Sequence, residues 1–261
     1  MNETLAILSL GALQGLTEFL PISSSMHLVL IDQFIWAHDP VLDVAVHFGS
    51  LLAVTFVFWR EVIRLFSGLS DVCRLKFTPN AHLLLLLILA TIPVIVAGLY
   101  LDGLGWENLH QTKIIGAASL GFGLLLWGAE RFGQGARGLK DWRFGSALAM
   151  GIAQIFALIP GASRSGVTMT AALSLGFSAK EAARIALLMS IPVIAGAATL
   201  KGYQLISSGD FTLSGAVGLA VASSFAASLV AIPVMLWVLQ RIGYAPFVIY
   251  RCALGIYLLI V

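Results

Sequence analysis

The sequence predicts an all-α polytopic membrane protein, an inverted-topology repeat with six transmembrane helices and two re-entrant helix-turn-helix hairpins. Hydrophobic residues make up 59% of its 261 residues and charged residues only 11%, whereas soluble domains carry about 25% charged residues. The mean hydropathy is +0.96, and the apolar residues form long runs, not the short alternating segments of a membrane β-barrel. A disordered chain, a coiled coil and an ordinary soluble enzyme are therefore excluded.

Two apolar stretches are too interrupted to be simple spans. The first, within residues 4–38, carries Glu18, Pro21, the serines at 23–25 and His27 at its centre. The second, residues 144–179, is interrupted in the same way by a Pro/Gly/Ser-rich turn that contains Arg164. Irregular backbone at membrane depth is tolerated only where protein buries it or where it lines a wet cavity. Each stretch is therefore predicted to enter and leave on one face of the membrane, as a hairpin.

Six further segments are predicted to cross the membrane as helices. About 20 helical residues span the hydrocarbon layer. Four segments approach or exceed that length, and two are shorter. The four are residues 41–59, 81–101, 213–240 and 244–261, and the two are residues 114–129 and 185–200. Together with the hairpins they form one integral membrane domain over residues 1–261.

Basic residues set the predicted orientation, because cytoplasmic loops carry an excess of Lys and Arg. Two clusters stand out, Arg60, Arg64, Arg74 and Lys76 in one loop and Arg131, Arg137, Lys140 and Arg143 in another. Both loops are placed in the cytoplasm, which puts residues 102–113 and the N-terminus outside. The net charge of only +2, without a basic stripe, argues against a nucleic-acid partner.

This orientation divides the chain into two halves of opposite topology. Repeat one, about residues 1–130, is a hairpin from outside plus three spans. Repeat two, about residues 144–261, is a hairpin from inside plus three spans. Proline spacing agrees, because Pro21 and Pro93 are 72 residues apart and Pro160 and Pro233 are 73 apart. Ser24 and Ser163 each lie three residues after the hairpin proline, so the two tips are expected to meet near the midplane.

The hairpin tips carry groups that are costly at membrane depth, roughly 2.5–3.5 kcal/mol per charge on insertion scales. Glu18 and Arg164 lie in opposite tips, and Gln14 shares a helix face with Glu18. The second tip offers backbone N–H groups, hydroxyls and a guanidinium, which suit a phosphate. The first offers a carboxylate for a divalent cation and, in His27, an acid, base or nucleophile. This combination is typical of phosphoryl transfer.

Two segments resemble the signatures of a known family. Residues 11–27, GALQGLTEFLPISSSMH, and residues 158–168, LIPGASRSGVT, are similar to the two signatures of the undecaprenyl-diphosphate phosphatases, also called bacitracin-resistance proteins. Similarity at residues 58–60, 190–192 and 246–251 extends the resemblance over nearly the whole chain. It implies a multi-pass bacterial inner-membrane enzyme that hydrolyses undecaprenyl diphosphate to undecaprenyl phosphate and phosphate. That activity recycles the lipid carrier for cell-wall synthesis and gives bacitracin resistance.

The resemblance also implies roles for individual residues. The expected catalytic residues are Glu18, Ser24, His27 and Arg164, and the expected phosphate-binding residues are Ser23, Gly161, Ser163, Arg164, Ser165 and Thr168. A divalent cation, Mg²⁺ or Ca²⁺, is expected on Glu18, with Gln14 beside it where many members have Glu. Further candidates are Ser25, Tyr250 and Arg251, of which Tyr250 and Arg251 are interpreted first as interfacial anchors of the last helix.

Several alternatives stay open. Ser24 attacks with His27 as base, His27 activates water, or His27 attacks directly. A lipid-phosphate transporter or flippase is the rival class, alone or in addition to hydrolysis, because transporters share inverted repeats and broken helices. The expected partners are the isoprenyl diphosphate and membrane lipids, with a homodimer left open, and the site is expected to open to the outer face. Asp43 and His47, at the outer end of a span, are interpreted as solvated.

Overall fold

The computed structural model describes residues 3–24, 26–27, 39–102, 111–133, 135–208 and 215–260. These segments are helical and contain no β-strand. Five helices are long and apolar enough to cross a membrane, which confirms a multi-pass membrane protein. They are α3 (Pro40–Val57), α5 (Pro79–Asp102), α6 (Thr112–Phe132), α9 (Ala179–Ser208) and α10 (Gly215–Arg241). Ser25, a candidate site residue, lies outside the described residues.

Shorter helices complete the described chain and form the interrupted segments. The first hairpin begins with α1 (Glu3–Thr17) and turns before Ser24. The second consists of α7 (Phe144–Ile155), a 3-10 turn η3 (Phe156–Leu158), an irregular turn, and α8 (Arg164–Ser174). The last helix is α11 (Ala245–Ile260), which with 16 residues is short for a span. Both breaks fall where the sequence predicts them, at the Pro/Ser segments.

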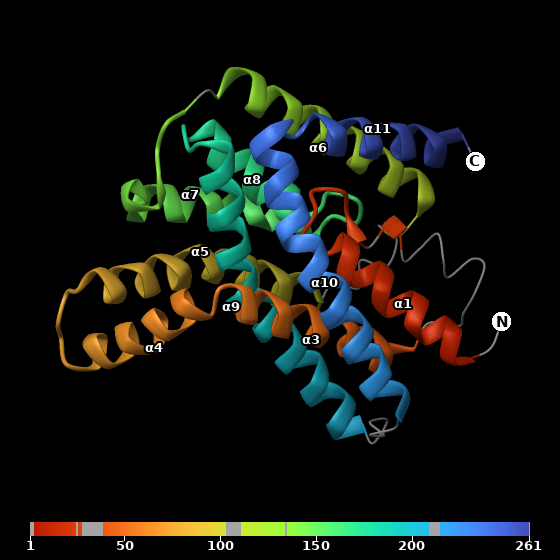
Figure 1. Cartoon of the computed structure of the whole chain (residues 1–261), viewed down its shortest axis with the longest axis horizontal. Coiled ribbons are helices and arrows are strands. Elements are labelled where there is room, and N and C mark those ends of the chain that lie inside the picture. The colour runs from red at the N-terminus through yellow and green to blue at the C-terminus, as the bar shows by residue number, and fades with distance from the viewer. Residues whose placement is uncertain are drawn as a thin grey trace.

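One sequence-based expectation about the basic clusters is wrong. Residues 60–73, expected as part of a cytoplasmic loop, form α4 (Trp59–Cys73), which packs on α5 as a helical pair that extends to one side of the molecule (Figure 1). Its narrow contact face is made possible by Gly68, since a Cβ there would lie 2.5 Å from the Asn80 carbonyl oxygen. Phe58 separates α3 from α4 without a side-chain cap. The other basic cluster contains a short 3-10 turn, η2 (Leu139–Asp141).

Small residues bring the helices together in pairs. α1 packs along α10, α7 along α5, α3 along α9 and α10, and α6 runs beside α11 (Figure 1). A Cβ on Gly15 would lie 2.4 Å from the Ser224 carbonyl oxygen of α10, and one on Gly151 would lie 2.7 Å from the Ala90 oxygen of α5. Gly116 and Gly255 approach each other reciprocally, each 2.8 Å from the other's oxygen. Membrane helices use small residues in this way because close backbone approach supplies their packing energy.

The core lies around α8 and the first half of α9, where the second hairpin is enclosed by α6, α7 and α9. Large fully buried side chains fill it, among them Phe19, Trp142, Phe177 and Tyr244. The Tyr244 hydroxyl donates to the Ala179 carbonyl at 3.1 Å, so its polar end is satisfied within the core. The tips of both hairpins therefore rest on a packed interior.

Candidate active site

Both tips turn on a serine in the left-handed backbone region. Ser23 has a φ of 69° and Ser163 a φ of 66°, and each directly precedes a helical residue, Ser24 and Arg164 respectively. Such a conformation costs a non-glycine residue about 1–3 kcal/mol and persists where its surroundings impose it. The backbone thus matches Ser163 with Ser23, and the expected correspondence with Ser24 is wrong by one residue.

The two tips meet at a buried ion pair. Arg164 donates from Nη2 to Glu18 Oε1 at 2.7 Å, and Glu18 is only 9% exposed. The other carboxylate oxygen, Oε2, accepts from Gln14 Nε2 at 2.7 Å and from Ser24 Oγ at 3.0 Å. Glu18 therefore joins the end of α1, the start of the second limb and the N-terminus of α8. The sequence placed Glu18 and Arg164 in facing tips, and the structure brings their side chains into contact.

The hydroxyls expected to bind phosphate are mostly bonded within the tips. Ser163 caps α8, its Oγ accepting from Gly166 N at 3.2 Å, and lies 3.1 Å from Ser165 Oγ. Ser165 donates to the Leu20 carbonyl of the first tip at 2.8 Å. Thr168 is fully buried and donates back to the Arg164 carbonyl. In this arrangement Ser165 and Thr168 hold the tip together.

Gly161 has a requirement of its own. Its φ is +91°, and a Cβ there would lie 2.4 Å from the Ile115 carbonyl oxygen of α6. Only a residue without a side chain fits this turn and this close approach. Gly161 therefore shapes the second tip and lets it lie directly against α6.

His27 is held by two partners, neither of which is Ser24. Its Nδ1 lies 2.7 Å from the Ser23 carbonyl oxygen and its Nε2 lies 2.6 Å from the Tyr250 hydroxyl. A carbonyl only accepts, so Nδ1 carries the proton and the Nε2 of a neutral ring accepts from Tyr250. The rings of His27 and Tyr250 also stack, with centroids 5.6 Å apart. Ser24 contacts Glu18 instead, which differs from the expected pairing of Ser24 with His27 as its base.

His47 is a residue near the site whose place the sequence did not reveal. Its Nε2 lies 3.9 Å from Glu18 Oε2, and its Nδ1 donates to the Asp43 carbonyl at 2.8 Å. The side chain is about one-third exposed, at 32%. Its sequence neighbourhood identified only the Asp43 contact, four residues away. The contact with Glu18 arises because α3 packs against α1.

The oxygens around Glu18 suit a cation that the substrate shares. Among the described residues, no group of three or more His, Cys, Asp or Glu could hold a metal by itself. Gln14 Oε1, however, is buried and has no hydrogen-bond partner in the part of the chain that the structure describes. Mg²⁺ is commonly bound by one or two carboxylates together with substrate phosphates. Glu18 with Gln14 fits that mode, and does not fit a closed site of protein ligands alone.

The two candidates on α11 occupy different surroundings. Tyr250 is 45% exposed and contacts His27. Arg251 is fully buried and donates to backbone carbonyls of both tips. The interpretation of Arg251 as an interfacial anchor is therefore wrong, because an anchor places its guanidinium in the headgroup region.

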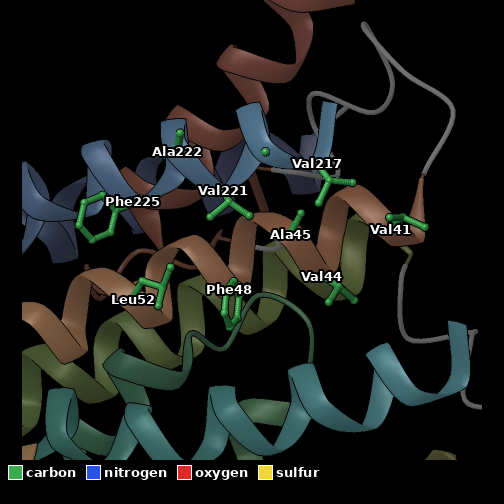
Figure 2. Close-up of a pocket in the computed structure, with 10 residues that line it drawn as sticks. Val41, Val44, Ala45, Phe48, Leu52, Val217, Val221, Ala222 and Phe225 are labelled. Atoms are coloured by element: carbon green, nitrogen blue, oxygen red, sulfur yellow. The ribbon is translucent and has the colours of Figure 1, made fainter. Parts of the chain in front are cut away.

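An apolar groove of about 600 Å³ lies between α3 and α10 (Figure 2). Its lining residues are Val41, Val44, Ala45, Phe48, Leu52, Val217, Gly218, Val221, Ala222 and Phe225. None of the expected site residues is among them. Its chemistry suits a hydrocarbon chain, whereas the charged groups gather at the two tips.

The fold and the site define a multi-pass membrane protein with a buried acid–guanidinium pair between two broken helices. Residues 7–257 match the family described as bacitracin resistance protein BacA. The chain is 43% identical to the undecaprenyl-diphosphatase of Roseobacter denitrificans, covering 97% of both chains. It is 45% identical to that of Chromohalobacter salexigens, covering 99% of this chain and 98% of the relative. The chain belongs to the BacA family.

Proposed function

We propose that the protein hydrolyses undecaprenyl diphosphate to undecaprenyl phosphate and inorganic phosphate. Full-length relatives named undecaprenyl-diphosphatase support this substrate. The observation that carries the chemistry is the contact between Glu18 and Arg164 across the two tips. It places an anion-binding group beside a cation-binding group in a largely apolar protein. A diphosphate headgroup requires both, because its charge must be neutralised where water is scarce.

The substrate's terminal phosphate is bound by Arg164 and the first backbone N–H groups of α8. A helix N-terminus stabilises an anion, and a guanidinium can donate two parallel hydrogen bonds to phosphate. Glu18 and Gln14 would hold the divalent cation, Mg²⁺ or Ca²⁺. When bound, the cation supplies charge neutralisation of the phosphate oxygens. Binding of the phosphate requires Arg164 to exchange part of its bond with Glu18 for the substrate.

Ser24 is the nucleophile that the contacts favour, with Glu18 receiving its proton. Ser24 Oγ already donates to Glu18 Oε2. Attack on the terminal phosphorus forms a Ser–O–P bond and breaks the P–O–P bond, and undecaprenyl phosphate leaves. Water then hydrolyses the seryl phosphate. Trapping a phosphoenzyme that is absent in Ser24→Ala distinguishes this route from attack by His27 or by water that His27 activates.

The proposed topology is six spans and two re-entrant hairpins in the bacterial inner membrane, with the site open to the outer face. The two halves are an inverted repeat with a constant offset of 140 residues. Equivalent positions under that offset are Gly11 and Gly151, Gln14 and Gln154, Ser23 and Ser163, and Pro93 and Pro233. The pairing of α1 with α10 then corresponds to that of α7 with α5, which supports the repeat.

Phosphate release tests the proposed function directly. The purified protein in detergent is expected to release phosphate from undecaprenyl diphosphate with added Mg²⁺ or Ca²⁺, and to stop when EDTA removes the ion. Absence of phosphate release by folded protein with either ion would contradict the proposal. Unchanged turnover in EDTA would contradict the cation at Glu18 only.

The inverted repeat also favours a second candidate, transport of the lipid phosphate across the bilayer, because transporters bind at such repeat interfaces. Sealed liposomes with substrate in one leaflet distinguish the two activities. Movement of labelled lipid without phosphate release supports a transporter. Phosphate release without net movement supports hydrolysis alone, and coupled appearance of both supports the two together.

A further inference from the structure

Arg251 links the two hairpin tips through a single buried guanidinium. It donates from Nη1 to the Pro21 carbonyl of the first tip at 3.3 Å. It donates from Nη2 to the Gly161 and Ala162 carbonyls of the second tip, at 3.1 and 2.9 Å. Its Nε donates to the Ser119 carbonyl of α6 at 3.1 Å. Four bonds therefore connect α11 to α6 and to both tips.

Two glycines leave the path that this side chain follows. A Cβ on Gly166, in α8, would lie 2.7 Å from Arg251 Nη1. A Cβ on Gly123, in α6, would lie 3.1 Å from Arg251 Cγ. The glycine that ends the second signature is thus explained by the room it gives to Arg251.

The bonding of Arg251 is directed at backbone, not at an opposite charge. Within the described segments, no carboxylate forms an ion pair with it. A buried charge is costly unless hydrogen bonds compensate it, and irregular backbone at membrane depth needs donors for its carbonyls. A planar guanidinium meets both needs at fixed spacing, whereas a lysine offers one point of attachment.

We propose that Arg251 is a positioning residue that fixes the two tips relative to each other, and so sets the geometry of Glu18 and Arg164 for the phosphate. The inference rests on the proposed function. Glu18 lies three residues before Pro21, and Arg164 lies two after Ala162. A shift of either tip therefore moves the group that binds the cation or the phosphate. Arg251 itself does not contact the substrate, because four of its five donors are engaged in the tips and α6.

Kinetics of two variants test the proposal. Arg251→Lys removes the fork, and Gly166→Ala displaces it while every polar group remains. Both are expected to raise the KM for undecaprenyl diphosphate about 10- to 100-fold, since small misplacements of binding groups cost that much. Gly121→Ala is the matched control, because its Cβ would meet nothing within 4 Å. A merely structural role lowers the folded fraction and the apparent kcat but leaves KM unchanged, and that result would overturn the proposal.

Hydrogen exchange provides a readout that does not depend on activity. The Ala162 amide donates to the Ile159 carbonyl at 3.0 Å within the second tip. Arg251→Lys is expected to speed exchange at residues 159–163 relative to Gly121→Ala, with α4 and α5 unchanged. Unaltered exchange in the tip contradicts the proposal. If the wild type releases no phosphate, the proposed function fails, and the exchange comparison still decides the role of Arg251.

Discussion

The carboxylate of Glu18 is the residue on which the site depends most. Glu18→Gln keeps the size but removes the charge that Arg164 and Ser24 contact. Loss of one electrostatic group of this kind lowers kcat about 10²–10³-fold in well-characterised enzymes. We expect a similar loss, measured as phosphate release from undecaprenyl diphosphate.

A second buried ion pair provides the control. Glu61 in α4 accepts from Arg184 in α9 at 2.6 Å, and it is not part of the site. Glu61→Gln removes an equivalent charge and is expected to keep kcat within about 3-fold of wild type, because changes away from the reacting groups mostly alter stability. Equal turnover in Glu18→Gln and Glu61→Gln would remove Glu18 from the catalytic residues.

The Tyr250 hydroxyl contributes a smaller effect through His27. Tyr250→Phe removes the donor to Nε2, and one hydrogen bond contributes about 0.5–1.5 kcal/mol. The expected loss in kcat/KM is therefore about 2- to 10-fold. Tyr257→Phe, an exposed tyrosine on the same helix, is the control and should be silent. An equal loss in both variants would show that His27 does not need this partner.

At this scale the sequence predicted the members of the site better than their bonds. Gln14 and Glu18 contact each other because four residues make one helical turn. The partner of Ser24 could not be predicted, because it depends on the left-handed φ of Ser23. Arg251 could not be assigned either, since its four acceptors come from segments 89 to 230 residues away.

The contact of α1 with α10 is the element-scale feature that places Glu18. A Cβ on Gly15 would lie 2.4 Å from the Ser224 carbonyl and 2.7 Å from Ala227 Cβ. Gly15→Ala is therefore expected to separate the helices and to destabilise the protein by about 1–3 kcal/mol, as overpacking does. Thermal unfolding in detergent measures it.

A glycine without neighbours in α10 supplies the opposite expectation. A Cβ on Gly218 would meet nothing within 4 Å, so Gly218→Ala is expected to be neutral or to stabilise by up to about 1 kcal/mol through helix propensity. If Gly15→Ala were as stable as Gly218→Ala, the close approach of α1 and α10 would not govern stability.

Helix ends followed the apolar pattern where lipid decides, and departed from it where packing does. Predicted residues 81–101 became α5 (Pro79–Asp102), nearly unchanged. Predicted residues 185–200 became part of α9, which continues to Ala179 and Ser208. Its first turns carry charges, including Arg184, that hydropathy rejects but an ion pair with Glu61 stabilises. The helix α4 was missed for the same reason, because its charged residues read as a loop.

For the whole molecule, the two halves are most simply related by the pairs of helices that join them. α1 with α10 and α7 with α5 each connect a hairpin limb of one half to a proline-containing helix of the other. Proline spacing alone gave 72 and 73 residues, which hid the constant offset of 140. The single-residue difference lies in the tips, where Pro21 and Pro160 precede their serines by two and three residues. A hairpin limb in either half is thus packed by the opposite half, so neither half could bury its tip alone.

This arrangement makes the orientation of the whole chain testable with its own cysteines. Of the two cysteines, Cys73 is exposed beside the basic Arg74. In a Cys252→Ala background, we expect a membrane-impermeant maleimide to label Cys73 only after spheroplasts are lysed, because Lys and Arg mark the cytoplasmic side. The control is Gln111→Cys in a protein that lacks both native cysteines, at the opposite end of α5 and the start of α6. It should be labelled in intact spheroplasts. Labelling of Cys73 in intact spheroplasts, with Gln111→Cys protected, would invert the topology and place the opening of the site on the cytoplasmic face.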